Sequence, residues 1–405
     1  MLQSRCAMES TPGSIGAPTA QKEHPTHLAA RHLLIDWTAR LLLFSGLVIG
    51  LAWPAEAAPE GRALYAGMLI TIASAAYLLA SVEPVALWIH QRVKEYPLPV
   101  ALLPVAWLAL LYPYILSAEQ DPAEVLFFGV FLFLATAAAI LNVSTLQRAD
   151  ISLGLILVAV PLVMPVIPDT PFSAQAHAAP LTARAIAFLL PLALLLLTNT
   201  QQKQRLNLLF ICAALALWYS AHFGALPTLP IGREANAFAQ LTIPVAGLYM
   251  LAIAGRFDRL GLSFRLTPRQ VSITASNAVL LTALYVPLGL VAGALVPAFS
   301  GPALLEALWR WLSIFLLQAL PTEILLRSTL ITYLQDDLQL SPLVAIAVSV
   351  VASVVVGWTS LSWLLALSAI AAVFYARIFL ATRNVVASGI VHGTLMWVLW
   401  LLFGG

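Results

Sequence analysis

Residues 303–334 read ALLEALWRWLSIFLLQALPTEILLRSTLITYL. This stretch stays largely apolar for longer than the ~20 residues that an α-helix needs to cross a bilayer. It also contains Glu323 and Arg327, which are four positions apart and therefore lie on one face of a helix. An ionisable side chain at membrane depth costs roughly 2.5–3.5 kcal/mol on insertion scales. The stretch therefore predicts a membrane helix whose charge pair needs a partner, a cavity or a function.

The rest of the chain has the same apolar character, with 61% hydrophobic and 9% charged residues. A water-soluble fold cannot bury that much apolar surface, so we predict an all-α, polytopic membrane helix bundle. Apolar runs of spanning length predict about thirteen transmembrane helices. They lie near residues 33–53, 64–82, 97–117, 124–143, 151–168, 182–198, 206–222, 236–254, 274–297, 303–334, 342–358, 361–380 and 385–403.

Lysine and arginine recur in alternate loops, and cytoplasmic loops are the ones enriched in these residues. We therefore expect a multi-pass protein of a cell membrane, specifically a bacterial inner membrane, with a cytoplasmic N-terminus. The domains expected are a disordered cytosolic tail (1–31), an N-terminal membrane block of about eight helices with no recognised role (32–254), a basic cytosolic loop (255–272) and a C-terminal membrane block (273–405).

Bulk properties exclude several function classes. The net charge is +2 and the basic residues are scattered, so nucleic acid is not an expected partner. The partners expected are membrane lipid and a membrane-embedded or lipidated protein or peptide. Cys212 and His222 could suggest a thiol enzyme, but ten helical positions separate them by ~15 Å. A transporter is less favoured, because the N-terminal block has almost no intramembrane polar residues to coordinate cargo.

The remaining intramembrane charges favour structural roles near helix ends. Asp36 and Arg40 are four residues apart at the start of the first span, where a structural ion pair is the simpler interpretation. Glu306 and Arg310 repeat this spacing and favour an interfacial anchor. Only Glu323 and Arg327 lie deep in their span, so that pair is the most informative in the chain.

One histidine, His392, lies inside the last span between Gly389 and Gly393. That GxxxG spacing allows another helix to approach closely, so we expect the imidazole to face the bundle. No histidine occurs between His222 and His392, so the C-terminal block cannot build a histidine-based metal site from its own residues. We expect no metal and no cofactor.

Three short motifs in order resemble those of the CPBP family, the CAAX proteases and bacteriocin-processing intramembrane proteins. Thr322–Arg327 resembles the family's Glu-Glu-x-x-x-Arg, Val356–Ser360 stands where the family has Phe-x-x-x-His, and Ser388–His392 leads into its His-x-x-x-Asn. The resemblance covers about residues 300–400 and implies a CAAX-protease-like membrane domain within 273–405.

The resemblance implies an endopeptidase that cuts peptide bonds within the membrane, for example after the prenylated cysteine of CAAX proteins. In that scheme the first glutamate and the second-motif histidine activate water, while the third-motif histidine and asparagine stabilise the oxyanion. This chain departs from it at three positions, where it has Thr322, Ser360 and Met396. Glu323, Arg327 and His392 remain as candidate catalytic residues.

Two interpretations of these remnants stay open. In the first, the chain is a divergent glutamate-dependent protease, with Glu323 as base, His392 as oxyanion donor and Arg327 holding the carboxylate. In the second, it is a catalytically silent relative that acts as a scaffold, immunity or assembly factor. Adjacent helix positions point ~100° apart, so Glu323 is expected to face away from the place of its lost neighbour. The chemistry of the remaining residues favours the second interpretation.

Overall fold

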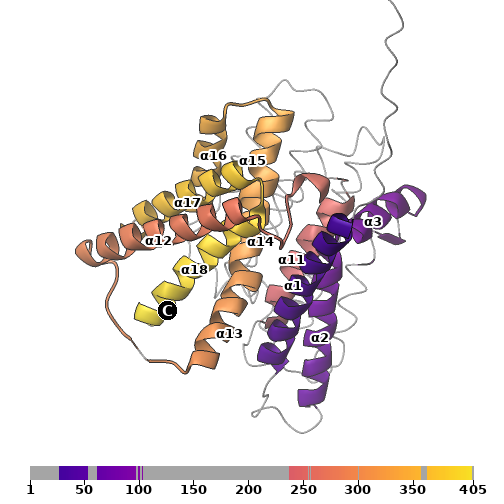
Figure 1. Cartoon of the computed structure of the whole chain (residues 1–405), viewed down its shortest axis with the longest axis horizontal. Coiled ribbons are helices and arrows are strands. Elements are labelled where there is room, and N and C mark those ends of the chain that lie inside the picture. The colour runs from indigo at the N-terminus through magenta and orange to yellow at the C-terminus, as the bar shows by residue number, and fades with distance from the viewer. Residues whose placement is uncertain are drawn as a thin grey trace, which may run out of the picture.

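Every regular element that the structure describes is a helix, in agreement with the predicted all-α class (Figure 1). This computed structural model describes residues 27–52, 62–96, 99–100, 103, 237–253, 255, 257–299, 301–356 and 363–403. The expected spans near 124–143, 151–168, 182–198 and 206–222, and nearly all of 97–117, lie outside these ranges, as does Ser360. The count of about thirteen helices therefore stays a prediction.

The described N-terminal helices are α1 (His27–Ala52), α2 (Arg62–Ala80), α3 (Glu83–Glu95) and α11 (Ala237–Ile253). Helix α1 thus begins inside the expected tail. Helices α2 and α3 meet at a bend of 85°. We expected a loop where α3 lies, and that expectation is wrong, because Glu83 and a proline in the first turn give α3 a good helix start.

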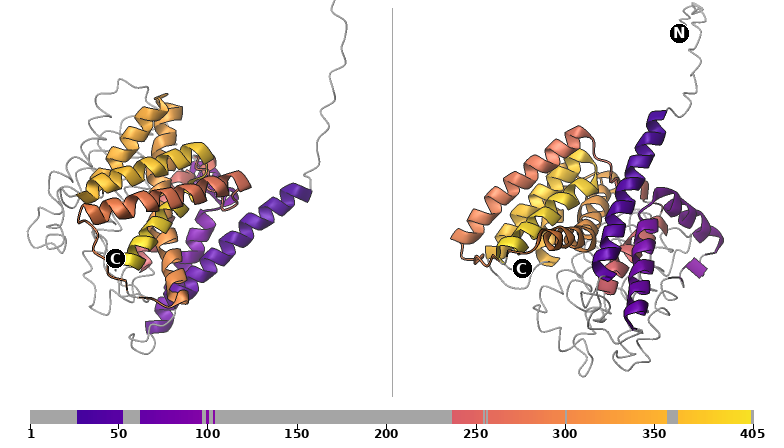
Figure 2. Two further views of the ribbon diagram at one scale, coloured as in Figure 1. Left: turned by 60° about the vertical axis from the view of Figure 1, so that its left-hand side comes forward. Right: turned by 60° about the horizontal axis from the view of Figure 1, so that its bottom comes forward.

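The C-terminal block is built around one long helix, Leu304–Asp337. Its α-helical parts are α13 (Leu304–Ile314), α14 (Leu320–Glu323) and α15 (Leu330–Thr332), and its π-helical parts are Phe315–Ala319, Ile324–Thr329 and Tyr333–Asp337. The other helices are α12 (Pro268–Val291), α16 (Pro342–Val356), α17 (Trp363–Thr382) and α18 (Val385–Phe403). Helices α12, α17 and α18 lie side by side, and α18 also packs along the long helix (Figure 2).

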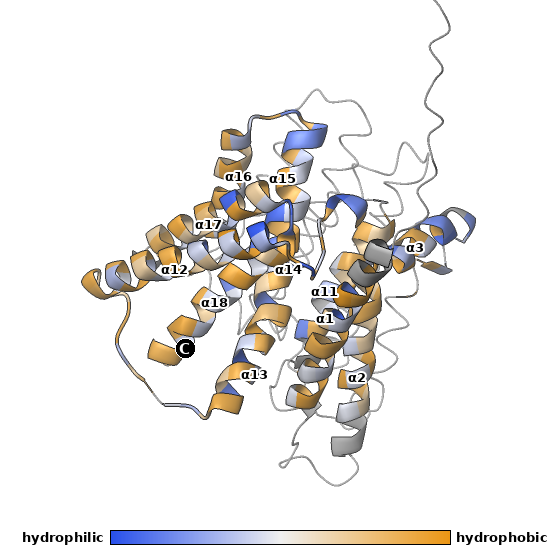
Figure 3. Cartoon of the chain, viewed as in Figure 1, coloured by the Kyte–Doolittle hydropathy of each residue, from blue (hydrophilic) through white to orange (hydrophobic). Residues whose placement is uncertain are grey.

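Length and apolar composition identify five described helices that are able to cross a membrane, or six if the bent pair α2–α3 forms one span. Apolar residues cover most of these helices (Figure 3). In the most apolar 18-residue segment of the long helix 89% of the residues are buried, whereas in the corresponding segments of α1 and α12 17% are buried. The chain is therefore a multi-pass membrane protein, and its long helix is far more buried than α1 or α12.

One hydrophobic cluster crosses the expected domain boundary. It includes Leu47 of α1, Ile70 of α2 and Leu251 of α11 together with Phe315 and Leu320 of the long helix. The described N-terminal helices therefore pack directly on the C-terminal block. The division at 255–272 remains a prediction, since the core is shared across it.

The expected structural role of Asp36 and Arg40 is confirmed. Arg40 Nε lies 2.7 Å from Asp36 Oδ2, and its Nη2 donates to the Leu262 carbonyl oxygen at 3.0 Å. A second donation reaches the Ser81 carbonyl oxygen at 2.6 Å, and the Phe264 amide donates to Asp36 Oδ1 at 2.7 Å. This buried pair therefore ties α1 to the α2–α3 corner and to the segment before α12.

Helix α1 approaches the long helix through Gly50. A Cβ at Gly50 would lie 1.3 Å from Trp309 Nε1, whereas a Cβ at Gly67 of α2 would have no neighbour within 4 Å. We therefore expect Gly50→Ala to lower the free energy of unfolding by about 1–3 kcal/mol through overpacking. Gly67→Ala, the matched control, should be neutral or stabilising by about 0.5–1 kcal/mol. Unfolding of the purified protein in mixed micelles measures both, and equal stabilities would contradict the close α1–α13 contact.

Candidate active site

The centre of the C-terminal block contains Glu323, whose side chain is fully buried at the end of α14. Its Oε1 lies 2.9 Å from His392 Nδ1 of α18. The hydroxyl of Ser388 donates to Oε2, and Arg327 Nε lies 3.4 Å from the same oxygen. Both carboxylate oxygens are therefore engaged, and the three candidate residues of the sequence form one cluster.

The local backbone brings Glu323 to this position. Two π-helical segments, Phe315–Ala319 and Ile324–Thr329, flank the short α14 on either side. A π-helical turn rotates the side chains that follow it relative to a regular α-helix, and such turns are frequent at functional sites. Glu323, and not Thr322, contacts His392, so Glu323 faces the cluster without taking the direction of its lost neighbour.

The close approach predicted from the GxxxG spacing is confirmed. A Cβ added at Gly389 would lie 3.4 Å from the Leu320 Cα, and one at Gly393 would lie 3.2 Å from the Phe315 Cα. With no side chain at these two positions, α18 lies directly against the long helix. His392 lies between them in sequence and reaches Glu323 for that reason.

Arg327 is buried and held by residues that the sequence did not single out. Its Nη1 donates to Ser353 Oγ at 2.7 Å and to Ser349 Oγ at 3.2 Å, both on α16. Its guanidinium also lies over the Tyr375 ring, 5.7 Å from the centroid. The four-residue spacing of two serines in an otherwise apolar helix was the available signal for these partners.

His392 is fixed by contacts on two sides. The Tyr375 ring of α17 stacks on the imidazole, with centroids 4.5 Å apart and planes at 15°. Ser388 also lies 3.2 Å from the Tyr375 carbonyl oxygen, so it links α17 to the carboxylate. Tyr375 and Ser388 were missed in the sequence, although Ser388 precedes His392 by one helical turn and so shares its face.

Two of the three positions at which the chain departs from the family pattern, Thr322 and Met396, take no part in this cluster. The hydroxyl of Thr322 donates to the Gln318 carbonyl oxygen at 2.6 Å, within its own helix. Met396, one turn after His392, lines a neighbouring pocket. Ser360 lies outside the described residues, so its surroundings remain untested.

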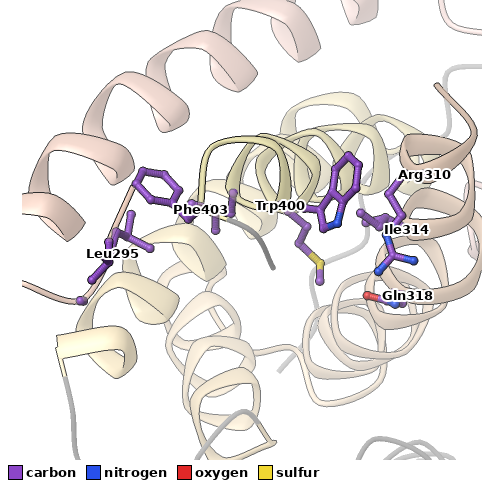
Figure 4. Close-up of a pocket in the computed structure, with 10 residues that line it drawn as sticks. Leu295, Arg310, Ile314, Gln318, Trp400 and Phe403 are labelled. Atoms are coloured by element: carbon purple, nitrogen blue, oxygen red, sulfur yellow. The ribbon is translucent and has the colours of Figure 1, made fainter. Parts of the chain in front are cut away.

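The pocket has a volume of about 600 Å³ and lies between the long helix, α18 and the segment that precedes α13 (Figure 4). Its lining residues are Ala294, Leu295, Val296, Arg310, Ile314, Gln318, Met396, Leu399, Trp400 and Phe403. Gln318 is one turn from Thr322 and Met396 is one turn from His392, about 5.4 Å along each helix. The pocket is therefore next to the cluster along α18 and the long helix, although no cluster residue lines it.

The Glu323–His392 pair is arranged so that the imidazole is able to transfer a proton. A carboxylate on Nδ1 orients an imidazole and leaves Nε2 available to accept or donate a proton, with the tautomer inferred from the hydrogen bond. The His392 side chain is 17% exposed, whereas that of Glu323 is 0% exposed. The imidazole is thus the member of the pair that a second molecule is able to reach. Among the described residues, no three His, Cys, Asp or Glu side chains form a metal-binding group.

Comparison with known proteins adds one match. Residues 304–398 match the family model of the type II CAAX prenyl endopeptidase Rce1-like proteins. Comparisons with curated proteins and with solved structures gave no match. The matched segment runs from the start of α13 almost to the end of α18 and contains the whole Glu323 cluster. Residues 304–398 of this chain are therefore similar to the Rce1-like proteins, which is consistent with a member of the CPBP family.

Proposed function

We propose that this chain is a divergent CPBP-type intramembrane peptidase in which His392 is the reacting base and Glu323 orients it. The observation that carries the proposal is the 2.9 Å contact between Glu323 Oε1 and His392 Nδ1 in a buried cluster beside a pocket. The proposal differs from the first interpretation of the sequence in one respect. Glu323 is too deeply buried to touch water, so the proton-accepting role passes to His392.

The reaction proceeds by general base catalysis. His392 Nε2 takes a proton from a water molecule as the water oxygen attacks the carbonyl carbon of a peptide bond. The imidazolium then gives this proton to the nitrogen of the leaving amine, and the C–N bond breaks. Water is the only other reactant, and the imidazole returns to its neutral form.

The buried ions support this role by balancing charge. Arg327 offsets the charge of Glu323, and its contacts with Ser349 and Ser353 fix its position. When His392 becomes positive during the reaction, the neighbouring carboxylate stabilises it. Met396 offers no hydrogen bond to the developing oxyanion, so the expected rate is low.

A silent relative is the second candidate, and one observation favours it. Both oxygens of Glu323 are engaged by protein groups, and the hydroxyl of Thr322 is bonded within its own helix. A cluster satisfied in this way also serves as a structural centre for a scaffold, immunity or assembly factor.

Mapping of new protein termini in membranes distinguishes the two candidates. Cells that express the chain should yield cleaved membrane peptides that are absent from a deletion strain. Cleavage should fall by about 10³-fold or more in His392→Ala and in Glu323→Gln. The matched control is His90→Ala, because His90 accepts or donates one bond, to the Ile253 carbonyl oxygen at 2.9 Å, outside the cluster. If all strains contained the same protein termini at equal abundance of the chain, the peptidase proposal would be contradicted and the catalytically silent relative would be supported.

A further inference from the structure

The pocket beside the catalytic pair is amphipathic. Most of its lining is apolar, including Leu295, Ile314 and Phe403, whereas Arg310 and Gln318 supply polar groups. Figure 4 shows Arg310 and Gln318 together on one side of the cavity, with Leu295 and Phe403 on the other. A volume of about 600 Å³ is in the usual range for a small-molecule site. The pocket thus suits one molecule with a polar head and an apolar chain.

The polar side of the pocket favours an anion. Arg310 supplies a permanent positive charge with several donors, and the Gln318 amide supplies a further donor. The Arg310 guanidinium lies 5.7 Å from the centroid of Trp400, so the ring holds the cation at the cavity wall. A planar carboxylate matches the fork geometry of a guanidinium.

The apolar side of the pocket adjoins exposed apolar residues. Val296 lines the pocket and is 73% exposed, and the adjoining Val291 and Leu305 are 88% and 80% exposed. Behind the pocket, α18 closes on α13, where Trp397 Nε1 donates to the Ala307 carbonyl oxygen at 2.7 Å. A peptide helix is ~10–12 Å across with its side chains, so a single acyl chain fits this space better.

We propose that the pocket binds the carboxylate of a long-chain fatty acid at Arg310 and Gln318, with the acyl chain passing Leu295 and Phe403 towards the bilayer. The proposal concerns binding alone and does not depend on peptidase activity. The end of the bound head at Arg310 would lie beside Trp400, which is eight residues and therefore ~12 Å along α18 from His392.

Tryptophan quenching by dibrominated stearate tests this site on the full chain in mixed micelles, because Trp400 forms part of the lining. We expect saturable quenching that is largely lost in Trp400→Phe. Dibrominated stearyl alcohol, which has the same chain without the charge, should bind at least about tenfold more weakly. A brominated two-chain phospholipid should quench without saturation, as ordinary boundary lipid does.

Arg310→Gln should weaken stearate binding by about tenfold or more and leave the alcohol unchanged. The matched control is Arg92→Gln, since Arg92 lies 5.8 Å from the Trp88 centroid in the same kind of contact but outside the pocket. Equal affinity of acid and alcohol for the unchanged protein would overturn the proposal, whether or not the Arg310 variant folds. Equal quenching by the phospholipid would identify ordinary lipid contact and also overturn it.

Discussion

Glu323→Ala and Arg327→Ala are each expected to lower the free energy of unfolding by about 3–5 kcal/mol, the largest stability effects that we predict. Each change leaves the other charge buried without its ionic partner, and the two side chains are 0% and 2% exposed. The double change should cost less than the sum of the two single changes, because it removes both charges together. Unfolding in mixed micelles, with the three variants compared as a cycle, measures the coupling.

The two single substitutions differ in the contacts that the remaining charged side chain keeps. Without Glu323, Arg327 keeps its donations to Ser349 and Ser353, whereas without Arg327, Glu323 keeps His392 and Ser388. The matched control is the exposed pair Arg92 and Glu95 at 2.7 Å, for which Arg92→Ala should cost at most about 1 kcal/mol. Single changes at the buried pair that left stability untouched would show that neither charge depends on the other.

Met396→Asn is expected to raise peptidase activity by about 10²-fold, the largest gain of function that we predict. Asparagine at this position would place an amide donor one turn from His392, and a single oxyanion donor is worth roughly 10²–10³-fold in kcat. The new amide would lie in the pocket that Met396 already lines, so no backbone movement is needed. The rate at which new termini accumulate in membranes measures the gain.

Leu399→Asn is the matched control for this gain, because Leu399 lines the same pocket and is not four residues from His392. It adds the same polar group about two helical turns, ~10 Å along the axis, from His392 instead of one. A similar rise in both variants would trace the effect to pocket polarity, and no rise in either would contradict the role of Met396 as a lost donor position. The Met396→Asn and Leu399→Asn variants therefore test the proposed function by a gain of activity, and the His392 and Glu323 variants test it by a loss.

Much of the helical architecture followed from the sequence because apolar length is a local property. The stretch around Glu323 and the last two spans were predicted close to their observed bounds, since each is a continuous apolar run. Helix α3 was missed because it is short and carries Glu83 and Arg92, which broke the apolar signal. The Rce1-like match of residues 304–398 agrees with the family expected from three short motifs.

The site itself was only partly predictable. The sequence identified three candidate residues, Glu323, Arg327 and His392, because ionisable residues are rare at membrane depth. Tyr375 and Ser388 were not identified, because an aromatic ring and a hydroxyl are ordinary residues in apolar helices and acquire a role only through their neighbours. The contact of Glu323 with His392 was not predictable, since it depends on which face of the long helix α18 packs against, and π-helical turns lie on either side of α14.

Three properties could be predicted from the residues alone: the chain forms membrane helices, its last block resembles the CPBP family, and few charges lie within those helices. Hydrophobic length and residue identity carry that information along the chain. The contact of Glu323 with His392, the contribution of α16 and α17 to the cluster, and the neighbouring pocket became visible in the folded structure alone. Those facts depend on how α18 packs at Gly389 and Gly393, and packing between distant segments is not a local property of the sequence.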